Sequence, residues 1–161
     1  LRVRWAGAEY RGRGRTTSWK GRASFSRAAI ERFDKIAIWN HERRFKLTDE
    51  SHLEFEAPVA GNLAALDVWL SEPVGGVRIE TNHGTLEAEL EDMGIEDRIL
   101  DAGGLHRRLM AYRLPDEPLA RAISYTCEID IVSGRDNPIW IAVITENGHQ
   151  AWTSPIYILA D

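Results

Sequence analysis

The sequence lacks the local motifs by which metal sites and nucleophilic active sites are usually recognised. Its single cysteine, Cys127, excludes an intrachain disulfide. None of the five histidines stands in an HxH or HExxH arrangement and no GxSxG motif occurs, so no local spacing indicates zinc, a two-metal centre or an activated serine. Apolar runs of about 18 residues are also missing, which excludes a transmembrane helix.

Lysine is scarce, because 17 of the 20 basic residues are arginine. Residues 1–46 contain 13 basic and 4 acidic residues, whereas residues 47–161 contain 7 and 21. The most conspicuous basic feature is the glycine-interleaved set Arg11, Arg13 and Arg15. The basic block (residues 1–46) and the acidic block (residues 47–161) either pair with each other within one fold or leave a basic surface for another domain or an anionic partner. The net charge of −5 argues against a dedicated nucleic-acid-binding module.

Short segments with alternating apolar and polar residues, separated by turn residues, recur along the chain. We expect about ten to thirteen strands and no long helix, which predicts one all-β domain over residues 1–161, an antiparallel β-sandwich of immunoglobulin-like or jelly-roll-like type. Residues 27–33 and 105–114 fit either a short helix or a strand. Residues 123–131 alternate most cleanly, and this pattern places Cys127 on the apolar face as a buried, protonated thiol.

The closing stretch is the strongest strand signal in the chain. Residues 139–145 are β-branched or aromatic at nearly every position, which predicts a strand buried on both faces. Asn147-Gly148 supplies the residue pair of a type I′ hairpin turn. The returning strand is interrupted at Pro155, which is typical of an outer strand.

Six tryptophans are many for this length, and most of them are expected in the core. Trp69 lies on the face opposite Leu66 and Val68, so it is either exposed or part of a second buried face. Two solvent-facing indoles in a row would form a platform on which a sugar ring can stack. Trp19 and Trp69 are therefore the candidate residues for carbohydrate binding.

The acidic residues between positions 91 and 101 are a candidate for calcium coordination by carboxylate oxygens. They do not have the DxDxDG spacing that would make this assignment specific. A solvated loop explains the pattern more simply, so no metal ligand is assigned within this chain. The residues that form this stretch are Glu91, Asp92, Glu96, Asp97 and Asp101.

Two stretches resemble a known family. Residues 136–158, which read DNPIWIAVITENGHQAWTSPIYI, resemble the final strand pair of large bacterial proteins related to metal-dependent phosphoesterases of the polymerase-and-histidinol-phosphatase type. Residues 3–9 (VRWAGAE) and 13–21 (RGRTTSWKG) are similar to the start of a β-rich domain in the same proteins. The resemblance covers about a quarter of the chain.

The resemblance implies a non-catalytic β domain cut from the C-terminal end of a longer chain, in bacterial cytoplasm or periplasm. The family's metal ligands lie in the preceding domain, so the resemblance implies a metal only there and carries no catalytic residue onto this chain. Our hypothesis is an accessory sandwich that packs on the catalytic domain of the same chain or shapes its substrate entrance. Arg11, Arg13, Arg15, Trp19 and Trp69 are its candidate surface residues. The alternative is a carbohydrate- or cell-surface-binding module that uses exposed tryptophans.

Overall fold

The chain is described from a computed structural model, which places residues 1–9, 11–12, 16–36, 44–60, 63–115, 122, 124–144 and 150–159. It divides into two compact units, Leu1–Asp116 and Glu117–Asp161. The helical structure in the described residues is one 3-10 turn, η1 (Leu90–Asp92). In the same residues, no helix is long and apolar enough to cross a membrane.

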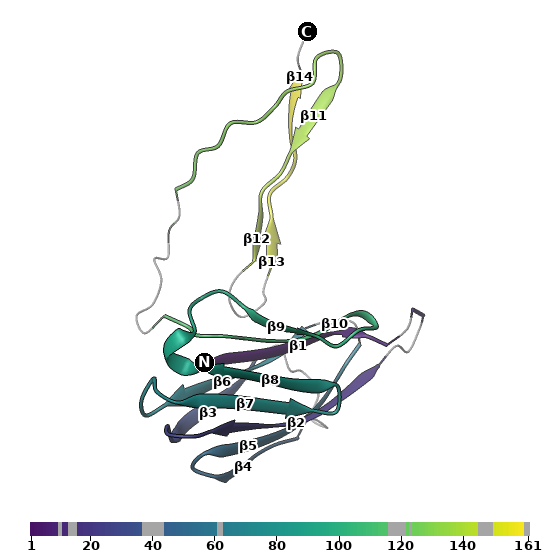
Figure 1. The fold of residues 1–161 in the computed structure, drawn as a ribbon. Coiled ribbons are helices and arrows are strands. Elements are labelled where there is room, and N and C mark those ends of the chain that lie inside the picture. The colour runs from purple at the N-terminus through teal and green to yellow at the C-terminus, as the bar shows by residue number, and fades with distance from the viewer. Residues whose placement is uncertain are drawn as a thin grey trace. The chain divides into compact units, whose positions relative to one another are not determined.

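The first unit consists of two five-stranded antiparallel sheets that pack against each other (Figure 1). The first sheet has the order β3-β6-β1-β10-β9, and the second sheet has the order β4-β5-β2-β7-β8. This arrangement confirms the all-β sandwich that the sequence predicts. The first sheet contains β1 (Arg2–Ala8), β3 (Ile30–Ile36), β6 (Leu63–Leu70), β9 (Arg98–Asp101) and β10 (Leu105–Tyr112). The second contains β2 (Thr17–Phe25), β4 (Arg44–Asp49), β5 (His52–Val59), β7 (Gly76–Thr81) and β8 (Gly84–Glu89).

The core lies between the two sheets and is built by alternate residues of the central strands. Trp5 of β1 stacks on Phe55 of β5, with ring centroids 4.6 Å apart. Trp19 of β2 is also fully buried, and its ring meets the edge of His83 with centroids 4.7 Å apart. Burying each large apolar side chain contributes about 1.5–3 kcal/mol, so this layer holds the sandwich together.

The two segments whose sequence fits either helix or strand, residues 27–33 and 105–114, each contribute a strand to the first sheet. Residues 30–36 form β3, which pairs with β6, and residues 105–112 form β10, which pairs with β1. The pairing of β10 with β1 is irregular at Gly7. Gly7 has a φ of 93° and lies so close to the His106 backbone that there is no room for a side chain. Sheet context therefore decides the structure where local sequence does not.

In its described residues, the second unit contains two short antiparallel pairs. β11 (Asp136–Ile139) pairs with β14 (Ile156–Leu159), and β12 (Ala142–Ile144) pairs with β13 (Gln150–Trp152). The closing hairpin of the sequence analysis thus forms, while its Asn147-Gly148 turn lies outside the described residues. The Asn137 amide closes the preceding turn by donating to the Val132 and Arg135 carbonyls at 3.0 and 2.9 Å.

Two expectations for the second unit are wrong. The strand predicted to be buried on both faces is exposed, with Trp140 at 59% and Val143 at 50%, because each strand of the hairpin has a single partner among the described residues. Residues 124–131 belong to no ladder among the described residues, and Cys127 is exposed, so the prediction of a buried thiol fails. All ten sandwich strands lie in the first unit, and a single sandwich over residues 1–161 stays a prediction.

Candidate functional site

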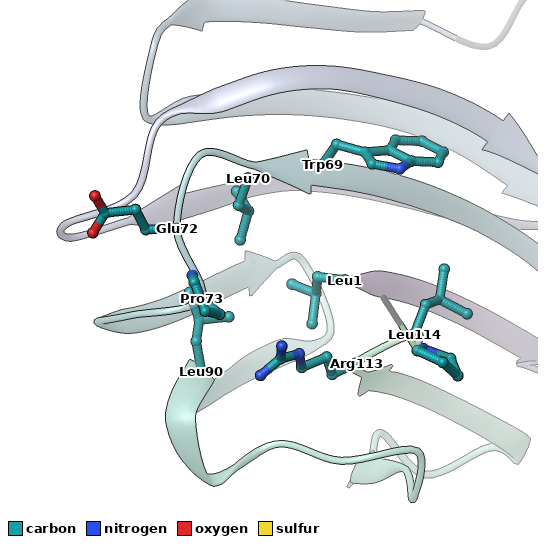
Figure 2. Close-up of a pocket in the computed structure, with 9 residues that line it drawn as sticks. Leu1, Trp69, Leu70, Glu72, Pro73, Leu90, Arg113 and Leu114 are labelled. Carbon is teal, nitrogen blue, oxygen red and sulfur yellow. The ribbon is translucent and has the colours of Figure 1, made fainter. Parts of the chain in front are cut away.

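A pocket of about 360 Å³ opens at one end of the sandwich in the first unit. Figure 2 shows the Arg113 side chain extending between Leu90 and Leu114, with Leu70 and Pro73 nearby. Its lining is mostly aliphatic, with a guanidinium and the Glu72 carboxylate as charged groups. It has the size of a site for one large side chain or a small ligand. The full lining is Leu1, Trp69, Leu70, Glu72, Pro73, Leu90, Arg113, Leu114 and Pro115.

Trp69 connects this pocket to the outer face of the first sheet, the face that points away from the core. On β1, Val3 and Trp5 point into the core, so the alternating residues Arg2 and Arg4 lie on the outer face. A solvated outer face would leave such residues exposed, yet Arg2 is only 2% exposed. Its outer-face neighbours are buried as well: Ala65 is 1% exposed, Asp67 5% and Met110 8%.

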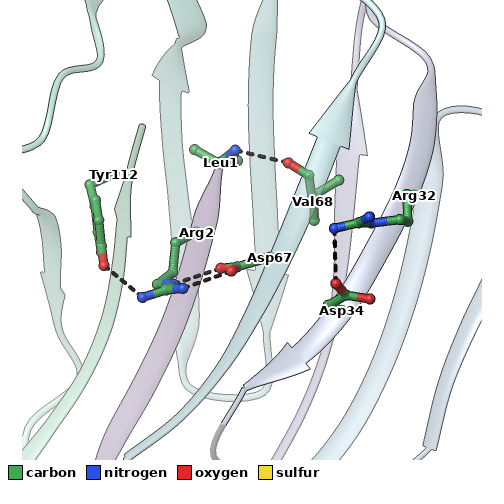
Figure 3. A network of polar contacts seen from close by, with 7 residues as sticks. All are labelled: Leu1, Arg2, Arg32, Asp34, Asp67, Val68 and Tyr112. Carbon is green, nitrogen blue, oxygen red and sulfur yellow. Dashed lines mark hydrogen bonds and ion pairs between the residues drawn. The ribbon is translucent and has the colours of Figure 1, made fainter. Parts of the chain in front are cut away.

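Arg2 is held by a pair of hydrogen bonds from β1 to β6. Its Nε donates to Oδ1 of Asp67 at 2.6 Å, and its Nη2 donates to Oδ2 at 2.7 Å. Its Nη1 donates to the Tyr112 hydroxyl of β10 at 3.3 Å (Figure 3). One guanidinium therefore ties together the three central strands of the first sheet.

The partners of Arg2 keep its guanidinium charged in spite of its burial. Burial by itself would lower the pKa of the Arg2 guanidinium, but the hydrogen bonds and negative charge of Asp67, with a further contribution from Tyr112, raise it overall. A bidentate arginine–carboxylate contact satisfies donors and acceptors that would otherwise be stranded away from water. Removing one partner would leave an uncompensated charge, which typically costs about 3–5 kcal/mol.

Arg4 extends the same arrangement toward β9. Its guanidinium carbon lies 5.3 Å from the centre of the Tyr112 ring, and its Nη2 forms an ion pair with Asp97. Three buried atoms in this area, Arg4 Nε, Asp97 Oδ1 and Arg108 Nε, have no hydrogen-bond partner among the described residues. The buried polar atoms in this part of the outer face are thus less completely hydrogen-bonded than those of Arg2.

The opposite edge repeats the combination of arginine, aromatic ring and aspartate. Arg32 of β3 faces Trp69 of β6 in register, and its guanidinium carbon lies 3.8 Å from the centre of the indole ring system. Arg32 also donates to Asp34 at 3.1 Å (Figure 3). We call the whole set the arginine–aromatic layer. Its members are Arg2, Arg4, Arg32, Trp69 and Tyr112, together with Asp34, Asp67 and Asp97.

The outer face of the second sheet has a different composition. Lys20 pairs with Glu56 at 2.9 Å and Arg22 with Glu54 at 3.0 Å, in both cases with side chains that are well exposed. Arg78 pairs with Glu80 in the same manner. Exposed pairs of this kind contribute little to stability and are typical of a solvated surface.

A histidine–aspartate contact lies at one end of the second sheet. His52 Nδ1 is 2.7 Å from Asp49 Oδ1, beside a pocket of about 850 Å³ that Ser24 and Ser51 also line. The backbone N–H of Ser51, followed by the His52 side chain, lowers the pKa of Asp49. Among the described residues, no serine hydroxyl is hydrogen-bonded to His52. Asp49 therefore acts as a turn-stabilising acceptor, and within the described ranges no nucleophile is aligned with the imidazole.

The acidic stretch gives no metal site in the part of the chain that the structure describes. No group of three or more His, Cys, Asp or Glu side chains is placed there to hold a metal ion. Asp97 instead pairs with Arg4, and Glu91 accepts hydrogen bonds from Gly75 and Arg27. These carboxylates serve internal contacts.

The structure separates the residues that the sequence selects as candidates. Arg11 is exposed, while Arg13 and Arg15 lie outside the described residues. Trp19 has no exposed surface, so its ring is a core group and offers no face to a sugar. Trp69 is 38% exposed, but the Arg32 guanidinium already stacks against it.

Sequence reasoning did not select Asp67 or Tyr112, although they shape the outer face, and it considered Asp97 only as a possible calcium ligand and not as the partner of Arg4. Asp67 had one visible signal, because it is the single charge within residues 63–70. The contacts of Arg2 with Asp67 and Tyr112 span 65 and 110 residues, so no local pattern encodes them. The burial of Trp19 was also predictable, because alternation along the strand places it on the same side as Ala23 and Phe25.

Comparison with family models, with curated proteins and with solved structures gave no match for this chain.

Proposed function

We propose that this chain is an accessory β-sandwich that docks on a partner domain through the outer face of its first sheet. The observation that carries this proposal is the arginine–aromatic layer. Arginine, tyrosine and tryptophan are the residues most enriched at the energetic centres of protein interfaces. In this chain they gather on one face, while the other outer face presents exposed ion pairs.

The charge of the layer favours a protein partner over a polyanion. Arg2 is paired with Asp67, Arg4 with Asp97 and Arg32 with Asp34. The three guanidiniums are thus neutralised within the chain, and a phosphate backbone would have to compete with their carboxylates. Arg2 is itself buried, but the Arg32 side chain is 61% exposed and Trp69 is 38% exposed, so these two groups remain suited to contacts with protein side chains.

The pocket at the end of the sandwich adds a second element of such an interface. It adjoins Trp69 and is lined mainly by aliphatic groups such as Leu70, Leu90 and Leu114. Interface centres commonly consist of an anchor side chain from one protein in a pocket of the other. We infer that an apolar side chain of the partner enters here.

The partner that fits the sequence resemblance is a metal-dependent phosphoesterase domain preceding this unit in the same chain. In this proposal any metal belongs to that domain, and the sandwich supports it or borders its substrate entrance. This identification rests on residues 136–158 and on the two N-terminal stretches of the resemblance.

Binding of chain 1–161 to the separately produced preceding domain tests the proposal. We expect Trp69→Ala to weaken binding at least about 30-fold, the effect of a 2 kcal/mol hot-spot residue. The matched control is Arg22→Glu on the second sheet, which should leave affinity unchanged. Absence of association, or equal affinities for both variants, would overturn the proposal.

A further inference from the structure

Residues 124–132 of the second unit form an exposed, alternating segment that belongs to no ladder among the described residues. One row of the segment is apolar, with Tyr125 83% exposed, Ile129 49% and Ile131 40%. Cys127, in the same row, is exposed as well. The other row is polar at Ser124, Thr126, Glu128 and Asp130 and ends at Val132, which is 50% exposed.

This segment has the composition of a strand that lacks a neighbour. β-branched and aromatic residues at every second position favour a pleated backbone with one covered face. An unpaired strand presents a row of N–H and C=O groups on which another chain can pair. Its C-terminal end is held by Asn137, whose Oδ1 accepts from the Val132 N–H at 2.9 Å and whose amide donates to the Val132 carbonyl.

We propose that this segment pairs antiparallel with the same segment of a second copy of the chain, about a two-fold axis at Cys127. In this register Tyr125 faces Ile129 of the other copy, and Cys127 faces its own counterpart. On the polar side Thr126 faces Glu128 and Ser124 faces Asp130. Within the ladder of residues 124–130 every apolar residue meets an apolar one and each carboxylate meets a hydroxyl, while Ile131 and Val132 lie beyond it.

Registers with the axis one residue away are less favourable, because one opposes like charges and the other shortens the ladder. An axis at Glu128 would place the two Glu128 carboxylates directly opposite each other, and like charges in that position destabilise a sheet. An axis at Thr126 would shorten the described ladder and leave Ile129 outside it. The axis at Cys127 is the one that combines a long ladder with separated charges.

A second copy suits this surface better than a partner of other chemistry. The polar row carries two carboxylates and no basic residue, which disfavours anionic partners such as nucleic acid. The apolar row is complementary to itself in the register above. A two-fold contact of identical segments is also the commonest way in which soluble chains associate.

Analytical ultracentrifugation of chain 1–161 over a concentration series tests the association. We expect a monomer–dimer equilibrium whose dissociation constant rises at least about 10-fold in Ile129→Lys, because that lysine would face Tyr125 away from water. The matched variant Thr126→Lys lies one row over and would face Glu128, so it should dimerise as well as the parent or better. A parent that is monomeric at all concentrations, or equal weakening by both lysines, would overturn the proposal.

Oxidation with diamide tests the register. Two Cys127 thiols would form one disulfide while diamide accepts the two electrons and two protons. Facing residues of an antiparallel pair have Cα atoms about 4.5–5.5 Å apart, within disulfide range. In the double variant Ser124→Cys, Cys127→Ser, the two thiols would be about 20 Å apart along the strands and should not cross-link. Equal cross-linking of both proteins would exclude this register.

Discussion

The two outer faces of the sandwich both belong to five-stranded antiparallel sheets, but they differ in how exposed their side chains are. On the second sheet, β2 alternates between buried and exposed residues, as a strand with one solvated face does. On the first sheet, β6 is buried at five consecutive positions, Ala64 to Val68. The comparison shows that strand order alone does not decide how buried an outer face is. The side chains that the central strands carry outward decide it.

The difference is also one of electrostatic environment. Arg2 and Asp67 have side chains 3% and 7% exposed, whereas those of Arg22 and Glu54 are 47% and 48% exposed. Water screens the second pair, so its loss should have little effect. Loss of one member of the first pair strands a charge in a region that water does not reach.

The largest predicted effect follows from this contrast. We expect Asp67→Ala to lower the free energy of unfolding by about 3–5 kcal/mol, because Arg2 would lose its buried partner. Glu54→Ala, the control on the second sheet, should change stability hardly at all. Urea unfolding of both variants measures the difference. The double variant Arg2→Met, Asp67→Leu should recover most of the loss, since apolar residues can replace a buried ion pair.

The second prediction concerns packing on the two outer faces. Ala65 is 1% exposed and faces Arg4 and Ile36 across its two neighbouring strands. We expect Ala65→Leu to destabilise the protein by about 1–3 kcal/mol through overpacking. Ser18→Leu adds similar volume to the outer face of the second sheet, and surface substitutions usually change stability by less than about 0.5 kcal/mol. Equal thermal shifts for the two variants would mean that the outer faces are equally open.

The smallest predicted effect is on the pH dependence of stability. The hydrogen bond and charge of Arg78 lower the pKa of Glu80. A lowered folded pKa means that the contribution of Glu80 to stability is complete above the ordinary glutamate pKa and is lost as pH falls through the folded value. We therefore expect Glu80→Gln to reduce stability slightly at pH 7 and to match the parent near pH 2. Urea midpoints across this range test the sign, and a larger difference in acid would contradict it.

The fold was predictable from sequence to the extent that local patterns encode it. Alternation in residues 66–70 correctly placed Trp69 on the face opposite Leu66 and Val68. Alternation did not predict the burial of Arg2 and Asp67, because that burial depends on partners brought together by sheet order over 65 and 110 residues. In the second unit, high β-propensity in residues 139–145 predicted a covered strand, but propensity specifies a backbone and not the layer that buries it.

Hydroxyl-radical footprinting of chain 1–161, alone and with the phosphoesterase domain that we propose as its partner, tests the central claim most directly because it reports the solvent access of individual side chains. We expect Trp69 and Ile99 on the first sheet to become protected in the complex. Leu47 on the second sheet, which is 41% exposed, should be oxidised as before. Protection of Leu47 with unchanged oxidation of Trp69 and Ile99 would contradict the account.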